Sequence, residues 1–196
     1  MGAVGGRLAR IRLPILTSRL ALRLPRRSDV PFLVRYVNHP VVFRPLVSRH
    51  KPFSRAEEEE WTRDSLSAAR KGEKLNLAIT LRDDGTHIGG IGLEIRDWDN
   101  GHGWTGYWLA PMYWHKGYAS EAASAVCEIA LRQLKLHRID ATVFEFNPRS
   151  MRVLRRLGFK REGGRRDVVF RGGRWYGEVC FGLIAKEFRP FRLVTN

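Results

Sequence analysis

Acidic residues and cysteines are both scarce in this chain. Its 196 residues include 20 Asp and Glu against 35 Lys and Arg, and only two cysteines, Cys127 and Cys180. Neither cysteine has metal-ligand or disulfide spacing around it, which argues against a disulfide scaffold and a cysteine-based zinc site. We therefore expect both to be small buried hydrophobic residues.

Long apolar runs are also missing. No run approaches the ~20 residues that span a bilayer, and the arginines at positions 7, 10 and 12 are not followed by an apolar block of signal-peptide length. A 43% hydrophobic fraction with 11% aromatics excludes a disordered chain. We expect a soluble, cytoplasmic protein with a flexible basic N-terminus over residues 1–12, a single domain over residues 13–189 and a tail over residues 190–196.

The excess of basic residues gives a formal net charge of +15 and a pI near 10.8. Such a charge attracts acidic partners at long range. It is compatible with nucleic acid, a ribosome surface, a membrane or a polyanionic cofactor as partner. A basic surface that only maintains solubility fits equally well.

Period-two and helical patterns divide the chain into alternating elements. Ser28 is expected to cap a short helix, and Ser54 with Glu57 forms a capping box for the second helix. Helices are predicted over residues 29–37, 54–70, 117–134 and 147–157. Strands are predicted over residues 19–24, 75–81, 86–96, 103–110, 138–144, 159–161 with 167–171, and 175–184.

The stretch over residues 106–123 is the most informative. An apolar strand ends at Pro111, a tight loop follows, and a helix begins near Gly117. The first N–H groups of a helix lack internal partners and carry the positive end of its dipole, so they suit a phosphate or pyrophosphate. Small residues in such a turn also serve packing alone. A dinucleotide fingerprint is disfavoured, because only one of its three glycine positions is filled.

Two segments of the chain together resemble a known superfamily. The loop Trp114–Ala119 resembles the acetyl-coenzyme A signature of the GNAT acyltransferases, with Trp114 where Arg or Gln is usual. The segment Asn147-Pro148-Arg149-Ser150 through Leu157-Gly158-Phe159 to Glu162-Gly163 resembles the second half of the same superfamily. Together with residues 106–111 and 136–139, these two segments resemble the ribosomal-protein N-acetyltransferase branch of the superfamily, the RimJ/RimL type.

This resemblance implies an α/β (α+β) GNAT fold, whose mixed, mostly antiparallel sheet has about seven strands with helices on both faces. It implies acetyl-CoA as cosubstrate and no metal. The strand over residues 103–110 should splay from its neighbour, with a bulge near Leu109 and Ala110 that presents a carbonyl-binding N–H. The expected cofactor-binding residues are Trp108, Leu109, Ala110, His115, Lys116, Gly117, Tyr118, Ala119, Ser120 and Asn147.

The same resemblance suggests how the leaving thiolate is protonated. Many members carry a Tyr seven residues after the Asn, and here that position is Leu154. Ser150 is the corresponding group in the RimJ/RimL-like branch and would donate to the sulfur, although it is also an ordinary residue for a helix start. Asn147 would orient the pantetheine.

The sequence does not identify the general base. Many relatives have a Glu three residues before the tyrosine of Gly-Tyr-Trp, and here that position is Trp104. We consider three substitutes, Glu94, His102 and Asp167, with Glu94 as our first choice and a surface role as the alternative for each.

The distribution of charge bears on the acceptor. Residues 152–174 hold nine Lys or Arg and two acidic residues, so this stretch should repel polyamines. We expect an N-acetyltransferase acting on a primary amine, first the α-amine of a protein N-terminus, possibly a ribosomal protein. Alternatives are a small-molecule amine acceptor, or a non-catalytic basic module that binds ribosomal RNA or another polyanion. Ribosome association and a homodimer are compatible with the sequence; a membrane partner is not expected.

Overall fold

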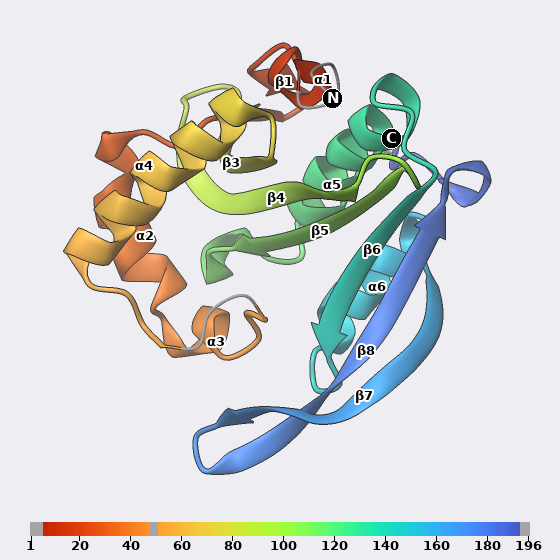
Figure 1. Ribbon diagram of the computed structural model, residues 1–196. Coiled ribbons are helices and arrows are strands. Elements are labelled where there is room, and N and C mark those ends of the chain that lie inside the picture. Colours follow the sequence, from red (N-terminus) through yellow and green to blue (C-terminus); the bar gives the residue numbers. More distant parts are fainter. Residues whose placement is uncertain (1–5, 48–50, 193–196) are drawn as a thin grey trace.

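The computed structural model describes residues 6–47 and 51–192 and has one mixed sheet of eight strands (Figure 1). The sheet order is β1-β2-β3-β4-β5-β6-β8-β7, and only the β5–β6 pair is parallel. The strands are β1 (Ile15–Leu16), β2 (Leu20–Arg23), β3 (Lys74–Leu81), β4 (His87–Asp97), β5 (His102–Leu109), β6 (Arg138–Phe144), β7 (Lys160–Arg171) and β8 (Arg174–Ile184). The predicted mixed sheet is confirmed, with the two-residue β1 as the strand that the alternation did not indicate.

Helices cover both faces of this sheet, as predicted (Figure 1). The pair α2 and α4 lies on one side, and α5 and α6 lie on the other. The helices are α1 (Gly6–Ala9), α2 (Val30–Val37), α3 (Pro40–Phe43), α4 (Arg55–Lys71), α5 (Tyr118–Glu128) and α6 (Pro148–Arg156), with a π-helical turn over Ile129–Gln133 after α5. None of the described helices has the length and apolar character that a membrane span requires.

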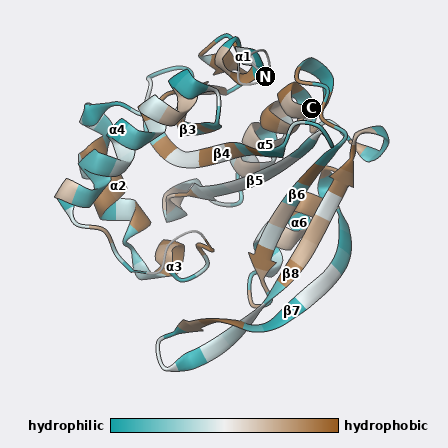
Figure 2. Ribbon diagram, in the orientation of Figure 1, coloured by the Kyte–Doolittle hydropathy of each residue, from teal (hydrophilic) through white to brown (hydrophobic). Residues whose placement is uncertain are grey.

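The core is built where α5 packs against the sheet. Ala122, Ala123, Val126 and Cys127 are buried at the helical spacing seen in the sequence, beside apolar residues of β2 to β6 (Figure 2). Burial raises the pKa of the Cys127 thiol to about 12, so it remains protonated and packs as a small hydrophobic group. Cys180 is half-buried, and neither cysteine is in a disulfide.

Helix starts follow the predicted chemistry at α4 but not at α2. At α4 the Ser54 hydroxyl accepts from the Glu57 N–H at 3.3 Å, and the Glu57 carboxylate accepts from the Ser54 N–H at 2.7 Å, which confirms the capping box. The prediction that Ser28 caps α2 is wrong. Ser28 lies inside a 3-10 turn, and the Asp29 carboxylate accepts from the Arg26 N–H at 2.7 Å instead. The same Asp29 carboxylate also binds the Arg23 guanidinium.

Both ends of the chain pack on the domain where they are described. Leu8 of α1 is 1% exposed, and the Phe191 N–H donates to the Ser124 hydroxyl at 2.9 Å. Over its described part, residues 6–12, the basic N-terminal segment holds the short helix α1, whose Leu8 is buried while residues 6, 7, 9, 10 and 12 are exposed. Residues 1–5 and 193–196 lie outside the described residues.

The divergence of β5 from β6 creates the space for a site. Parallel pairing covers only His102, Gly103 and Trp104 of β5, and beyond them β5 pairs with β4 alone. The predicted splaying is present. The bulge predicted near Leu109 and Ala110 is not, because the register shift between β4 and β5 falls between Ile95 and Asp97.

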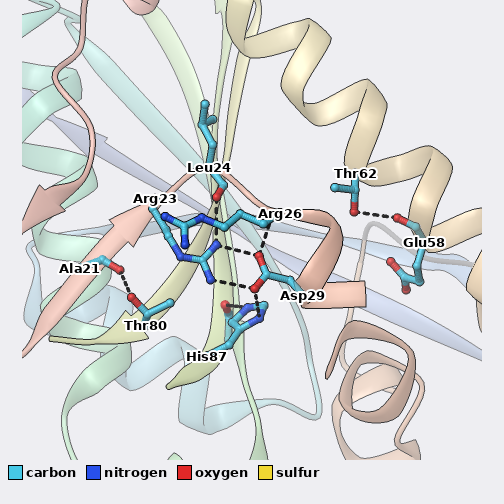
Figure 3. Close-up of polar contacts among 10 residues, drawn as sticks. Ala21, Arg23, Leu24, Arg26, Asp29, Glu58, Thr62, Thr80 and His87 are labelled. Carbon is cyan, nitrogen blue, oxygen red and sulfur yellow. Dashed lines mark hydrogen bonds and ion pairs between the residues drawn. The ribbon is translucent and has the colours of Figure 1, made fainter. Parts of the chain in front are cut away.

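A buried ionic cluster joins β2 to the start of α2 (Figure 3). Asp29 is 5% exposed and accepts from both terminal nitrogens of Arg23 at 2.7 Å, from the Arg26 N–H, and lies 3.4 Å from His87 Nδ1. Burial alone would raise the pKa of Asp29, but the hydrogen bonds from Arg23, His87 and Arg26 outweigh it and hold the pKa well below its usual range.

Replacing Asp29 by asparagine should destabilise the fold, because it leaves the Arg23 charge without its partner. We expect a loss of roughly 2–3 kcal/mol in the free energy of unfolding at pH 7, measured by denaturant titration. Because the folded-state pKa is depressed, the stabilisation exists above the unfolded-state pKa of about 3.9 and is lost as the pH falls further. The gap between wild type and variant should therefore narrow below pH 4.

The control is Asp64→Asn, on the exposed face of α4. It should change the stability by less than about 0.5 kcal/mol. An Asp29→Asn difference that is absent at pH 7, or unchanged between pH 7 and pH 2, would contradict the assigned role of this ion pair.

Candidate functional site

A cavity of about 800 Å³ opens where β5 and β6 diverge. Its walls come from residues 40–42 and 44–46, the end of β5, residues 113–115 and 117–120, and the segment 146–156 with α6. Of the residues predicted for the site, Trp108, Leu109, His115, Gly117, Tyr118, Ala119, Ser120, Asn147 and Ser150 line it. Ala110, Lys116 and Glu94 are not in the lining.

The start of α5 presents unpaired donors to this cavity. The first helical bond runs from the Glu121 N–H to the Gly117 carbonyl at 3.0 Å. The N–H groups of Tyr118, Ala119 and Ser120 therefore have no partner within the helix, at the positive end of its dipole. Gly117 has φ 81°, a conformation that suits glycine, and turns the chain into the helix. This arrangement is suited to an anion such as a pyrophosphate.

The start of α5 is held by the turn between β1 and β2, over residues 17–19. Glu121, 6% exposed, accepts from Arg19 Nε at 2.8 Å, from the Arg19 N–H at 2.8 Å and from the Thr17 hydroxyl at 2.7 Å. The Arg19 guanidinium lies 4.5 Å from the centre of the Tyr118 ring. These contacts could not be predicted from local patterns, since Arg19 and Glu121 are 102 residues apart in the chain.

Trp114 has a contact of its own in place of the usual Arg or Gln. Its indole N–H donates to the Leu109 carbonyl at 2.8 Å, and the Arg149 guanidinium lies 5.0 Å above its ring. Trp114 thus ties the loop to the end of β5 and to α6.

The free edge of β5 also presents backbone groups. The Ala110 N–H is bonded to the Ile88 carbonyl at 2.9 Å, so of Leu109 and Ala110, near which we predicted the carbonyl-binding N–H, Ala110 is not free. Antiparallel pairing alternates the direction of successive N–H groups. Those of Leu109 and Tyr107 therefore point away from β4, toward the gap that opens beside β6. Of the two predicted residues, Leu109 is therefore the candidate carbonyl-binding donor.

Across the gap, Ser150 meets a residue that we had not singled out. The Tyr107 hydroxyl lies 3.0 Å from Ser150 Oγ and 3.3 Å from the Ser150 carbonyl. Burial raises the pKa of Tyr107 far above its usual value, only partly offset by the bond to Ser150, so the phenol stays protonated. Asn147 Oδ1 accepts from the Ser150 N–H at 3.2 Å and caps α6. Tyr107 belongs to the Gly-Tyr-Trp motif, but the sequence did not indicate that its hydroxyl contacts Ser150.

The three candidate bases lie away from the cavity. Glu94 is 3.3 Å from Lys74 Nζ in an ion pair, and His102 Nε2 is 2.7 Å from Asp140 at the opposite end of β5. Asp167 is exposed on β7. The structure therefore does not bring Glu94 to Ser150. Among the described residues, no Asp or Glu lines this cavity, and none form a three-residue cluster able to hold a metal ion.

Arginines supply the charge of the cavity instead. Arg44, Arg149, Arg152 and Arg156 line it, and the last three follow one another at helical spacing on α6. The helical spacing of these three arginines is visible in the sequence, but we did not predict that they line the site.

The wall of the cavity over residues 40–46 is braced by β7. Arg171 donates to the carbonyls of Phe43 at 2.9 Å, Arg44 at 2.6 Å and Leu46 at 3.1 Å. Arg44 in turn donates to the Tyr176 hydroxyl of β8 at 3.0 Å.

Comparison with known proteins gives consistent matches. Residues 19–160 match a family model described as an acetyltransferase (GNAT) domain. The uncharacterized N-acetyltransferase YokL of Bacillus subtilis strain 168, derived from the SPbeta prophage, is 33% identical over 149 residues, 75% of this chain and 80% of that protein. The ribosomal protein uS5-alanine N-acetyltransferase of Escherichia coli K12 is 33% identical over 87 residues, 44% of this chain and 45% of that protein.

A solved structure supports the fold. RimL, a ribosomal L7/L12 alpha-N-protein acetyltransferase in complex with coenzyme A, superposes with a TM-score of 0.78. The alignment covers 88% of this chain and 98% of that one at 19% identity. At this identity the likeness shows the shared fold alone.

Gly117→Glu should weaken the binding of coenzyme A by at least about tenfold, measured by calorimetry. The carboxylate would place negative charge beside the free N–H groups of α5, where an anion is expected. Gly117→Ala is the matched control, because it imposes the same backbone strain of about 1–2 kcal/mol without the charge. A Cβ there would lie 3.3 Å from a terminal nitrogen of Arg19 and 3.4 Å from Phe191, so the added methyl is nearly accommodated.

The two variants should differ in affinity while both keep a cooperative melting transition. Wild-type affinity in Gly117→Glu would end the assignment of this loop to the cofactor.

Proposed function

We propose, on the premise that the chain belongs to the GNAT acetyltransferase family, that its acceptor is the α-amino group of a protein N-terminus. The family makes it an acetyl-CoA-dependent N-acetyltransferase. The acceptor and the RimJ/RimL-type, ribosomal-protein branch are our proposal. The observation that carries it is a cavity lined by four arginines and, over the described residues, by no carboxylate.

The residues around the cavity fit acetyl-CoA, which supplies the acetyl group as a thioester. The N–H groups at the start of α5 suit its pyrophosphate, and the open edge of β5 suits the amides of its pantetheine arm. We assign the acetyl carbonyl oxygen to the Leu109 N–H, which the strand pairing turns toward the gap. His115 lines the same cavity and stays a proposed contact.

Ser150 and Tyr107 have the roles of proton donor and positioning residue. As the amine nitrogen bonds to the acetyl carbon and the carbon–sulfur bond breaks, sulfur departs as a thiolate that needs a proton. Tyr107, kept protonated by burial, can donate to Ser150 Oγ and leave the Ser150 proton directed at the sulfur. The nitrogen releases one proton to solvent, the sulfur takes one from Ser150, and Ser150 regains one from solvent, so the reaction balances.

A cavity without a carboxylate suits an amine that is partly neutral by itself. An α-amino group has a pKa of about 7.7–8.0, so roughly a tenth of it is uncharged at pH 7, whereas a lysine with a pKa of about 10.4 has less than a thousandth. The arginines disfavour a polyamine by like-charge repulsion. The similarity to a ribosomal protein uS5-alanine N-acetyltransferase supports a protein acceptor. A net charge of +15 would favour an acidic carrier such as the ribosome.

Ser150→Ala should lower kcat by about 100-fold and leave the Kd of acetyl-CoA nearly unchanged, because only the departing thiolate uses the hydroxyl. Tyr107→Phe should lower kcat by a smaller factor, with the same unchanged Kd. Ser67→Ala, on the exposed face of α4, is the control.

A donor with a more acidic leaving thiol separates chemistry from structure. With such an acetyl donor, the losses of kcat in Ser150→Ala and Tyr107→Phe should both be smaller, because a better leaving group needs less help from a proton donor. A kcat that stays within about threefold of wild type in Ser150→Ala would assign protonation of the thiolate to another group.

The acceptor is tested by offering peptides with free and with blocked N-termini, a blocked peptide that contains lysine, spermidine and kanamycin, and following acetylation by mass. Transfer should go to the free N-termini and rise with pH through the pKa of the α-amine, near 8. Transfer to spermidine or kanamycin, with none to the free N-termini, would refute the proposed acceptor.

A further inference from the structure

The outer end of the β7–β8 hairpin has no part in the proposed reaction, yet it carries two exposed aromatic residues. Figure 1 shows the hairpin projecting away from the rest of the domain. Phe170 is 59% exposed and Trp175 is 54% exposed. They face each other across the strand pair, with ring centres 5.2 Å apart, and neither lines the cavity.

The opposite face of the hairpin fixes this pair in place. Tyr176 is buried and accepts from Arg44, and Arg171 bonds to the carbonyls of residues 43, 44 and 46. Because side chains alternate along a strand, Phe170 and Trp175 lie on the face turned away from these contacts. The two rings thus form an outward platform on an anchored hairpin.

Positive charge surrounds this platform. Three carboxylates near the two strands are engaged, Glu162 by Arg138, Glu178 by Arg165 and Glu187 by Lys160. The exposed arginines 161, 166 and 174 have no salt-bridge partner among the described residues, and Asp167 is the one nearby acid in β7 left to oppose them. Figure 2 shows hydrophobic and hydrophilic segments side by side at the tip.

This charge argues against a second copy of the chain as the partner. β7 is the outer strand of the sheet, and arginines along an outer strand oppose edge-to-edge pairing with a like-charged copy. A polyanion with flat apolar groups fits both features. Nucleic acid has both, and unpaired bases, which can stack on an aromatic ring, are presented mainly by single-stranded RNA and RNA loops.

We propose that the outward face of the β7–β8 hairpin binds single-stranded RNA. Bases would stack on Phe170 and Trp175, while Arg161 and Arg166 of β7 contact the flanking phosphates. Arg174, which lies over the Tyr176 ring on the other face, adds only its charge. This activity is separate from the proposed acetyl transfer, since the surface lies outside the cavity.

The test is the fluorescence anisotropy of a labelled oligouridylate with the full chain. A protein of charge +15 attracts any polyanion, so the decisive variant is Phe170→Ala/Trp175→Ala, which leaves the net charge unchanged. It should weaken binding about tenfold or more. Phe170→Tyr/Trp175→Phe keeps both rings and should bind nearly as wild type.

Salt dependence tests the arginines. Replacing Arg161 or Arg166 by Gln should reduce the slope of log affinity against log salt by about 0.7 for each lost phosphate contact. The matched controls are Arg63→Gln on the exposed face of α4 and Leu16→Ala, an exposed apolar residue at the other edge of the sheet. Neither control substitution should reproduce the loss of RNA affinity expected for the double alanine variant. All variants should keep a native melting transition.

Three results would overturn the proposal. These are equal binding by the wild type and the double alanine variant, equal binding of duplex and single-stranded RNA, and a wild-type dimer that the double alanine variant converts to monomer in sedimentation. The last would make the surface an interface between copies.

Discussion

The end of the parallel pairing between β5 and β6 is the constraint on which the site depends. After Trp104 the two strands separate, and β5 continues with hydrogen bonds on one side only. In a continuous sheet its other edge would be paired and covered. Here the separation leaves main-chain groups of Tyr107 and Leu109 facing a cavity, and it puts the starts of α5 and α6 on the two sides of the gap. A proton donor and an anion site can then face one ligand.

Two short bonds connect the parts of the site that the divergence separates. The Trp114 indole binds the carbonyl of Leu109, so the loop before α5 is fixed to the end of β5. The Tyr107 hydroxyl contacts Ser150, so the middle of the same strand is fixed to α6. The strand thereby sets the distance between the candidate anion site and the candidate proton donor, and a shift of β5 would move both.

The elements with strong local signals were predictable, and the contacts between distant segments were not. The capping box of α4 and the alternation of β2 are properties of neighbouring residues, and both were read correctly. The two-residue β1 is too short for any period, and the register shift between Ile95 and Asp97 depends on how two strands are joined. We considered Glu94 as a substitute for the Glu that is missing at Trp104, and the sequence does not show that Lys74 lies opposite Glu94 in the β3–β4 pair.

The brace from Arg171 has a consequence for how specificity can vary. Its hydrogen bonds to residues 43, 44 and 46 go to main-chain carbonyls, so these bonds do not depend on the side chains that those residues carry. A substitution at Leu46 would change the shape that an acceptor meets while these bonds stay in place. A few substitutions in this wall could thus adapt the same fold to different amine acceptors, without changing the part of the cavity that we assign to the cofactor.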